Sequence, residues 1–264
     1  MRANEIHRRW QAGEACVNGW LAIPSSFSAE LMAHAGWDSI TIDMQHGLVD
    51  YQAAVGMLQA ISTTATPPMV RVPWIEPGII MKCLDAGAMG VICPMGNTAE
   101  DAKKFVGACK YAPVGYRSVG PVRASIYAGA DYLANANDEI LAIAMIETTE
   151  AMANLDAILS TPGLDGIYIG PNDLALSMGE TPTIDPTNPK VVAEIERIID
   201  AANAKGIPAG IHCGAPEYAA NIIKRGAKLA TIGSDGRLLA AAASAAVKAC
   251  KGSDAAPAAS GSSY

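Results

Sequence analysis

Eight short apolar runs recur along the 264 residues of the chain, and segments with a helical pattern separate most of them. Val and Ile are frequent in these runs, and most runs lack the polar alternation of a half-exposed strand. Such runs are typical of parallel strands that are buried on both faces of a sheet. They cover residues 15–23, 39–43, 68–72, 90–94, 140–147, 166–170, 207–212 and 229–234.

This alternation of strand and helix predicts one α/β domain over residues 1–251, folded as a (β/α)₈ TIM barrel. A doubly wound open sheet is the alternative. That fold needs a glycine-rich dinucleotide loop after its first strand, whereas residues 23–26 read Ile-Pro-Ser-Ser. The helices are expected at residues 28–35, 51–61, 77–86, 98–109, 149–160, 188–204 and 216–225.

Two segments fall outside the alternation. Residues 111–138 contain Gly115, Arg117 and Pro121 and show no clear helix signal in their first half. We interpret them as a long insertion in a βα connection, and long ordered loops are often functional. Residues 252–264 are small and polar, which predicts a flexible C-terminal tail.

The balance of charge and polarity disfavours several classes of partner. The formal net charge is −7 and no basic run is present, so we expect no nucleic-acid partner. No apolar span approaches the roughly 18 residues of a membrane-spanning helix, so we expect no membrane partner. Residues 1–10 carry Arg2, Glu5, Arg8 and Arg9 with no apolar signal region after them, so we expect a cytoplasmic location. The cysteines show no Cys-x-x-Cys pair and no zinc-binding spacing, which favours reduced structural thiols in such a chain. They are Cys16, Cys83, Cys93, Cys109, Cys213 and Cys250.

Acidic side chains follow two of the predicted strands. The carboxyl ends of all strands in a barrel converge on one face, so residues that are distant in sequence become neighbours there. Glu147 and Asp173 occupy two such ends. Each could simply cap a helix, but a pair of carboxylates at adjacent strand ends suits a hard divalent cation. His212 is a possible third ligand, although a structural histidine is the simpler interpretation.

The remaining strand ends carry a candidate base and a candidate anion-binding group. Arg71 lies within a β-branched run, so it either pairs with an acid such as Asp43 or faces an anionic ligand. His46 becomes an oriented general base if Asp43 or Asp85 fixes its tautomer, and otherwise is a turn histidine that bonds only backbone. Asp85 sits at a helix C-terminus, where an acid is disfavoured, which suggests His46 or Arg71 as its partner.

Several ordered stretches resemble the HpcH/HpaI aldolase family of metal-dependent pyruvate aldolases. They are residues 42–47 (Ile-Asp-Met-Gln-His-Gly), 70–73 (Val-Arg-Val-Pro), 83–95, 144–148 (Ala-Met-Ile-Glu-Thr) and 166–174, which ends Gly-Pro-Asn-Asp-Leu. The resemblance implies a barrel whose C-terminal helix is exchanged between neighbouring subunits, typically in a hexamer built as a dimer of trimers. It also implies a small-molecule 2-oxo acid and an aldehyde as substrates.

The resemblance further implies roles for single residues. Glu147 and Asp173 match the ligands of Mg²⁺, Mn²⁺ or Co²⁺. Arg71 matches the arginine that contacts the keto oxygen, and His46 matches the base, with Asp85 as its partner and Asp43 in support. The turn Gly170-Pro171-Asn172 offers N–H groups for a substrate carboxylate.

Two positions depart from many family members and bear on the substrate. Met145 stands where they have glutamine, and Ser118 follows Arg117 where they read Gly-x-Arg-Gly. Met145 and Arg117 are therefore expected at the substrate, and the chain looks closer to a subgroup that accepts hydroxypyruvate as well as pyruvate.

The function that the resemblance implies is reversible cleavage of 4-hydroxy-2-oxo acids to pyruvate or hydroxypyruvate and an aldehyde, through an enolate that the cation stabilises. One alternative is a CoA-thioester lyase of the citryl- or malyl-CoA type, which would need basic residues around the mouth. Only Arg117 and Arg123 are obvious candidates for that role. The second alternative is a non-catalytic barrel, in which the acids, His46 and Arg71 have no reason to converge.

Overall fold

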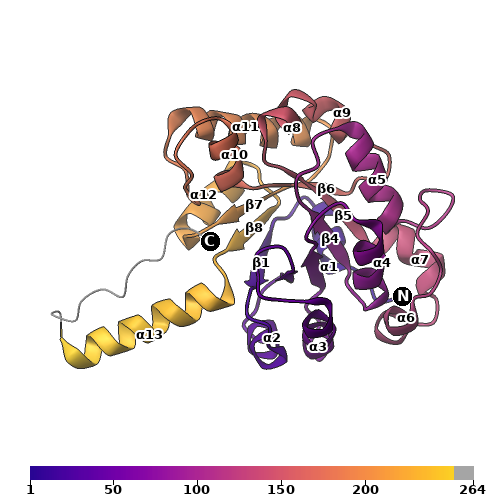
Figure 1. The fold of residues 1–264 in the computed structure, drawn as a ribbon, viewed down its shortest axis with the longest axis horizontal. Coiled ribbons are helices and arrows are strands. Elements are labelled where there is room, and N and C mark those ends of the chain that lie inside the picture. Colours follow the sequence, from indigo (N-terminus) through magenta and orange to yellow (C-terminus); the bar gives the residue numbers. More distant parts are fainter. Residues whose placement is uncertain (253–264) are drawn as a thin grey trace.

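Eight parallel strands close into a barrel in the computed structural model, which describes residues 1–252 (Figure 1). Neighbouring strands pair in chain order, and β1 pairs with β8 to close the sheet. The predicted (β/α)₈ barrel is confirmed. The strands are β1 (Cys16–Leu21), β2 (Ser39–Asp43), β3 (Pro68–Arg71), β4 (Gly90–Cys93), β5 (Leu141–Ile146), β6 (Gly166–Ile169), β7 (Ala209–Cys213) and β8 (Leu229–Ile232).

Helices surround the barrel and cover the outer faces of its strands (Figure 1). Ile, Leu, Val and Ala side chains from helices and strands form one continuous buried core between these two layers. The helices are α1 (Glu5–Gln11), α2 (Ser26–Ala33), α3 (Tyr51–Ile61), α4 (Pro77–Asp85), α5 (Ala99–Cys109), α6 (Val122–Ala128), α7 (Tyr132–Glu139), α8 (Thr149–Ala153), α9 (Leu155–Leu159), α10 (Pro171–Ser177), α11 (Pro189–Ala204), α12 (Pro216–Arg225) and α13 (Asp235–Lys251).

The barrel interior is packed, and α1 closes its amino-terminal end. Ile6 of α1 belongs to the same buried cluster as Met69, Leu141 and Leu229, which come from three different strands. The indole N–H of Trp10 donates to the carbonyl of Lys228 at 2.8 Å, just before β8. Because this end is covered, the carboxyl ends of the strands form the open mouth, as in other barrels of this type.

Residues 111–138 differ from the prediction in both position and structure. They follow α5 and precede β5, so they form an αβ connection rather than the predicted βα insertion, and they contain α6 and α7. An αβ connection lies at the amino-terminal end of a barrel, opposite the mouth. The predicted helix at residues 149–160 is also interrupted, because Asn154 separates α8 from α9 and donates to the carbonyl of Asn97.

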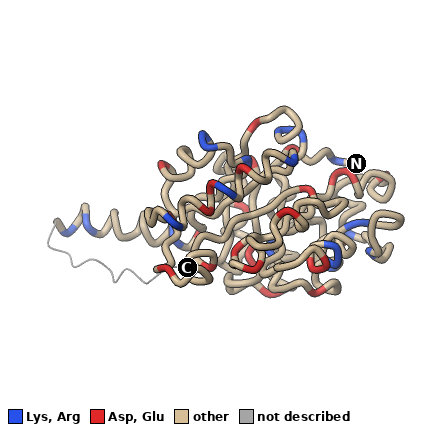
Figure 2. Tube along the Cα trace, turned by 90° about the horizontal axis from the view of Figure 1, so that it is seen from above, with Lys and Arg blue, Asp and Glu red and all other residues tan. Residues whose placement is uncertain are grey.

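The last helix extends away from the barrel in both Figure 1 and Figure 2. Only its first residue, Asp235, is buried, and Leu238, Leu239 and Val247 are exposed. The predicted flexible tail, residues 252–264, lies outside the described residues apart from Gly252. Among residues 1–252, no helix combines the length and the hydropathy that a membrane crossing requires.

Acidic and basic residues are interspersed along the chain rather than segregated (Figure 2). All six cysteines are free, and five of them are buried. Burial raises the pKa of Cys83 and of Cys109 to about 12, so these thiols stay protonated. The buried cysteines therefore pack as small apolar side chains.

Candidate active site at the barrel mouth

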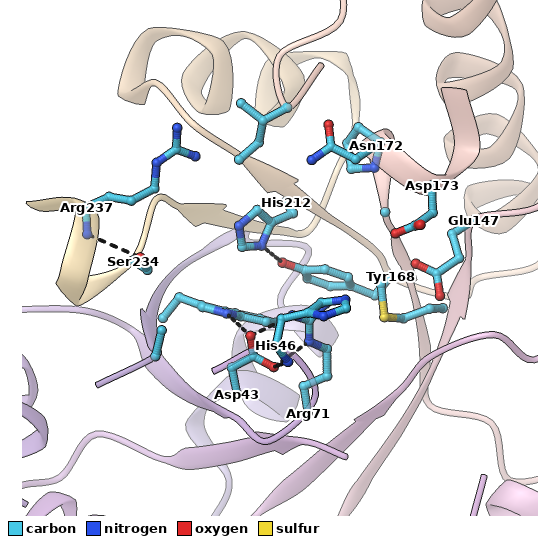
Figure 3. A pocket seen from close by; sticks show the side chains of 16 residues that line it. Asp43, His46, Arg71, Glu147, Tyr168, Asn172, Asp173, His212, Ser234 and Arg237 are labelled. Atoms are coloured by element: carbon cyan, nitrogen blue, oxygen red, sulfur yellow. Dashed lines mark hydrogen bonds and ion pairs between the residues drawn. The ribbon is translucent and has the colours of Figure 1, made fainter. Parts of the chain in front are cut away.

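A pocket of about 140 Å³ opens among the carboxyl ends of the strands (Figure 3). Most of the side chains predicted for the site line it together. They are Asp43, His46, Arg71, Met145, Glu147, Gly170, Pro171, Asn172 and Asp173. The convergence expected from strand order is therefore present in the structure.

Arg71 is held by Asp43 at the floor of the pocket. Its Nε donates to Asp43 Oδ1 at 2.9 Å and its Nη2 to Oδ2 at 2.6 Å. The guanidinium carbon lies 4.8 Å from the centre of the Trp20 ring, and the Trp20 indole also donates to Asp43. Within residues 1–252, Arg71 Nη1 makes no hydrogen bond, so this N–H₂ group is available to a ligand.

Asp43 is an ionised anchor rather than a proton-transfer group. Burial works to raise its pKa, but hydrogen bonds and the charge of Arg71 outweigh burial and lower it. The backbone N–H groups of Gln45 and His46 donate to its Oδ1 at 3.0 and 3.3 Å. The same carboxylate therefore fixes both the turn after β2 and the arginine on β3.

His46 stands at the exposed rim of the pocket, on the turn that Asp43 holds. Desolvation and the charge of Arg71 lower its pKa, against the opposing charges of Asp43 and Asp173. A lowered pKa keeps the imidazole neutral at pH 7, and a neutral imidazole can accept a proton. The geometry thus supplies a base beside the arginine.

Glu147 and Asp173 lie side by side across the pocket from Arg71 (Figure 3). Glu147 is almost fully buried, and its Oε1 accepts a hydrogen bond from the N–H of Met95 at 2.8 Å. Burial raises the pKa of Glu147 to about 7, and the charge of Asp173 acts in the same direction. A divalent cation would relieve the repulsion between these two facing carboxylates and favour the ionised form of Glu147.

The donor set fits a hard cation with open positions. Among the described residues, no third His, Cys, Asp or Glu side chain joins Glu147 and Asp173. Mg²⁺-type ions usually take one or two carboxylates and complete their shell with water and substrate oxygens. Gly170 permits the arrangement, because a Cβ at this position would collide with Glu147 Oε2.

The turn Gly170-Pro171-Asn172 begins α10 beside these carboxylates. Pro171 has no N–H, so the free donors of this first helical turn are those of Asn172 and Asp173. The Asn172 Oδ1 is buried and has no hydrogen-bond partner within the described chain. The backbone N–H groups of Asn172 and Asp173 and the Asn172 side-chain oxygen are therefore available to hydrogen-bond a substrate here.

His212 does not join the acids as a third ligand. Its Nδ1 lies 3.0 Å from the hydroxyl of Tyr168, and that hydroxyl donates to Thr231 Oγ1 at 2.6 Å. Because Tyr168 has one proton to give, it accepts from His212, which places the imidazole proton on Nδ1. Burial and the charge of Arg71 lower the pKa of His212 to about 3, so the ring is neutral.

Asp85 and Arg117 are not part of the pocket, which corrects two predictions. Asp85 ends α4, close to the amino-terminal end of the barrel, and it pairs with Arg117 Nη2 at 2.7 Å instead of with His46 or Arg71. Arg117 is buried and also donates to the Tyr132 hydroxyl at 2.9 Å. Within a single chain, both residues connect α4 to the 111–138 segment rather than contacting a substrate.

Five residues of the pocket were not predicted: Trp20, Ala22, Tyr168, Ile184 and Arg237. Trp20 and Tyr168 stack with ring centres 5.9 Å apart and lie inside strands, where their sequence context is that of ordinary core residues. Ile184 lies in an irregular segment between α10 and α11. Arg237 follows the last predicted strand, residues 229–234, and the start of α13 brings it to the mouth.

Known proteins resemble this chain over most of its length. Residues 19–242 match the family described as HpcH/HpaI aldolase/citrate lyase. The chain belongs to this family. It is 41% identical over 240 residues to a hydroxypyruvate/pyruvate aldolase of Rhizorhabdus wittichii, which covers 91% of this chain and 96% of the relative. It is 38% identical over 245 residues to a 4-hydroxy-2-oxo-heptane-1,7-dioate aldolase of Escherichia coli, with 92% and 93% covered.

A solved structure of a family protein from Burkholderia cenocepacia superposes with a TM-score of 0.88 at 31% identity. The superposition covers 95% of this chain and 100% of the Burkholderia cenocepacia chain. The predictions of the family, of the barrel and of an aldolase enzyme are thereby confirmed.

Proposed function

We propose that this chain is a divalent-metal-dependent aldolase that cleaves 4-hydroxy-2-oxo acids to pyruvate or hydroxypyruvate and an aldehyde. The observation that carries the proposal is the placement of Arg71 and His46 opposite the carboxylates of Glu147 and Asp173 in one pocket. The names of the two curated relatives support the same reaction class.

Glu147 and Asp173 would hold the cation, with Mg²⁺, Mn²⁺ or Co²⁺ as candidates. When bound, such an ion supplies Lewis-acid stabilisation of negative charge on the keto oxygen. The remaining groups of this chain act around that point. Arg71 Nη1 donates toward the same oxygen, and Asp43 keeps the guanidinium from rotating away. A preorganised donor of this kind costs no reorganisation during the reaction.

His46 carries the proton in this scheme. In cleavage, it accepts the proton of the C4 hydroxyl, the C3–C4 bond breaks, and C4 leaves as the aldehyde. The electron pair of the broken bond passes into the enolate of the 2-oxo acid. Protonation of C3 then gives pyruvate or hydroxypyruvate. A neutral imidazole suits the first step, because only the free base can take up the proton.

Met145 bears on the choice between pyruvate and hydroxypyruvate. Its side chain lines the pocket, it is paired in register with Tyr168 on β6, and it has no hydrogen-bond donor to offer. A flexible thioether adapts to ligands of slightly different shape. We therefore propose that both 2-oxo acids are accepted.

We also propose that α13 is exchanged between subunits of a hexamer, in the cytoplasm. The support is local. α13 extends away from its own barrel, and Leu238, Leu239 and Val247 on it are exposed. A helix with uncovered apolar side chains gains stability when a neighbouring subunit buries them.

The alternatives of the sequence analysis have less support. A CoA-thioester lyase would need Arg117 and Arg123 at the mouth, but Arg117 pairs with Asp85 and Arg123 donates to the carbonyl of Ala86, at the end of α4. A non-catalytic barrel gives no reason for Glu147 and Asp173 to face one pocket.

The proposal is tested by enolisation without any aldehyde. The metal-loaded enzyme is incubated with pyruvate in D₂O, and loss of the methyl proton signal is followed by NMR. We expect exchange in the wild type and none above background in Arg71→Ala, while the far-UV circular dichroism of the variant is unchanged. Equal exchange rates in the two proteins would remove Arg71 from the reaction.

A further inference from the structure

An irregular segment, residues 179–188, connects α10 to α11 at the rim of the pocket, and we call it the strap. One of its residues, Ile184, lines the pocket. Glu180 joins the two ends of the strap, because its carboxylate accepts from the side-chain amide of Asn188 and from Nζ of Lys190, both at 2.7 Å. The base of the strap is therefore closed, and the position of Ile184 depends on what holds the middle of the segment.

Asp185 holds the strap against the connection between β7 and α12. Its Oδ1 accepts from the N–H of Gly214 at 2.8 Å and its Oδ2 from the N–H of Ala215 at 2.9 Å. Ala215 is the N-cap residue of α12 and has no side-chain oxygen, so Asp185 supplies the carboxylate that a helix start favours. Pro186, the next residue of the strap, is buried.

Gly214 shows how closely the strap and the connection approach each other. A Cβ at this position would lie 2.8 Å from Ile184 Cγ2 and 3.1 Å from Asp185 Oδ2. The backbone of Gly214 is not left-handed, so a lack of space, rather than the conformation, calls for glycine here. Ile184 is thus packed on the connection, and it cannot move outward unless Asp185 releases its two donors.

The place of Ile184 decides which part of a ligand it meets. In the proposed reaction, the 2-oxo acid is bound on the side of Glu147 and Asp173. Figure 3 shows His212 on the other side of the pocket from these acids. Ile184 packs on Gly214, which follows His212 by two residues at the end of β7. The aldehyde half of the substrate is therefore the part that reaches Ile184.

We propose that Asp185 is a positioning residue that fixes Ile184 in the wall of the aldehyde subsite, and that Ile184 thereby limits the size of the aldehyde. This inference rests on the proposed aldolase reaction. An apolar wall discriminates by about 10- to 200-fold for each methylene group that it accepts or rejects. The discrimination needs a wall that does not yield, and the two hydrogen bonds of Asp185 keep it in place.

The test is the ratio of kcat/KM for a small and a branched neutral aldehyde, propanal and 3-methylbutanal, each condensed with pyruvate. We expect the wild type to favour propanal, and Ile184→Ala to lower the ratio about 10-fold. Asp185→Ala should lower the ratio in the same way, and Asp185→Asn, which keeps one acceptor oxygen, should retain part of it. Deuterium exchange into pyruvate needs no aldehyde, so Asp185→Ala should exchange at the wild-type rate.

A double variant separates positioning from a general loss of structure. If Asp185 acts through Ile184, the variant with both alanines should have the ratio of Ile184→Ala alone. Glu76→Ala is the matched control, because Glu76 also accepts from two backbone N–H groups at a helix start, those of Gly78 and Ile79 in α4. Glu76 is not in the pocket lining, so this variant should keep the wild-type ratio.

Four results would overturn the inference. An unchanged ratio in Ile184→Ala would show that Ile184 is not the wall, and an unchanged ratio in Asp185→Ala would show that the wall stands without Asp185. A further fall in the double variant, or slower pyruvate exchange in Asp185→Ala, would show that Asp185 acts elsewhere in the site.

Failure of the aldolase reaction itself would look different. The metal-loaded wild type would then form no product from either aldehyde and would exchange no deuterium into pyruvate. Circular dichroism of each variant confirms that the fold is intact.

Discussion

Asp43 fixes Arg71 through two parallel hydrogen bonds, Nε to Oδ1 at 2.9 Å and Nη2 to Oδ2 at 2.6 Å. The pairing follows from strand register, because Asp43 and Arg71 are directly opposed at the carboxyl ends of β2 and β3. The Nε and Nη2 groups of Arg71 therefore already donate to a carboxylate of the same chain. Nη1 makes no hydrogen bond within residues 1–252, so it can donate to a substrate oxygen.

Replacement of Asp43 tests this arrangement. Asp43→Asn leaves the Arg71 charge without its buried partner, so we expect a loss of about 3–5 kcal/mol in the free energy of unfolding. We expect kcat to fall by about 100-fold or more, because the donor is no longer preorganised. Denaturant unfolding and steady-state kinetics measure the two effects. Asp156→Asn, whose exposed ion pair with Lys205 is worth little, is the control, and similar behaviour of the two variants would contradict the account.

Tyr168 controls the tautomer of His212. Tyr168→Phe removes the hydroxyl that contacts both His212 and Thr231, and we expect a loss of about 1–3 kcal/mol in stability from the unpaired buried groups. ¹⁵N NMR of the imidazoles should show the proton on Nδ1 of His212 in the wild type and a mixture in the variant. Tyr51→Phe removes a longer bond to the carbonyl of Lys82 at 3.4 Å, so it should change stability little. A His212 ring already protonated on Nε2 in the wild type would refute the assignment.

The polar strand ends could be predicted from the sequence because their position depends only on strand order. Once the strands are parallel and close in sequence order, Asp43, Arg71, Glu147 and Asp173 must meet at one mouth. No side-chain detail enters that argument. The structure brings these four residues to one pocket, and it shows the Asp43–Arg71 pairing that the sequence left as one of two possibilities.

Other parts of the site depended on three-dimensional contacts that leave no local signal. Trp20 and Tyr168 have the sequence context of core residues and reach the pocket only because the barrel interior is open at one end. Asp85 was assigned the wrong partner because an acid at a helix C-terminus indicates that a cationic partner exists but does not identify that partner. The partner, Arg117, is brought to it by the 111–138 segment, which runs along the amino-terminal end of the barrel.

The structural role of Asp85 gives a separate prediction. Asp85→Asn deprives the buried Arg117 of its carboxylate, and we expect a loss of about 2 kcal/mol, below the value for a fully buried pair because Asp85 is 30% exposed. The dependence of kcat/KM on pH should keep the wild-type midpoint. A shifted midpoint with unchanged stability would instead make Asp85 the partner of His46, as the family resemblance implied.

Glu147 should destabilise the metal-free fold in a defined pH range. Burial raises its pKa from 4.5 to about 7, so between these values the folded chain holds a proton that the unfolded chain has lost. Stability of the metal-free wild type must then fall as the pH rises from about 4.5 to about 7 and level off above.

Replacement of Glu147 by glutamine removes this dependence of stability on pH. In EDTA at pH 8, Glu147→Gln should be more stable than the wild type by roughly 2–3 kcal/mol, and the difference should vanish near pH 5. Addition of Mg²⁺ or Mn²⁺ should stabilise the wild type and not the variant. Glu30→Gln, at an exposed position of α2, controls for loss of a surface charge. Equal stability of wild type and Glu147→Gln at pH 8 would show that burial of the ionised Glu147 carboxylate does not destabilise the fold.

Retro-aldol cleavage of a 4-hydroxy-2-oxo acid before and after removal of metal tests the central claim most directly. Pyruvate release is followed with the protein as purified, after exhaustive EDTA treatment, and after return of Mg²⁺ or Mn²⁺. The account predicts that activity is lost with the metal and restored with it, and that Glu147→Gln and Asp173→Asn are not restored. Cleavage that continues at the original rate in fully chelated wild type would contradict it.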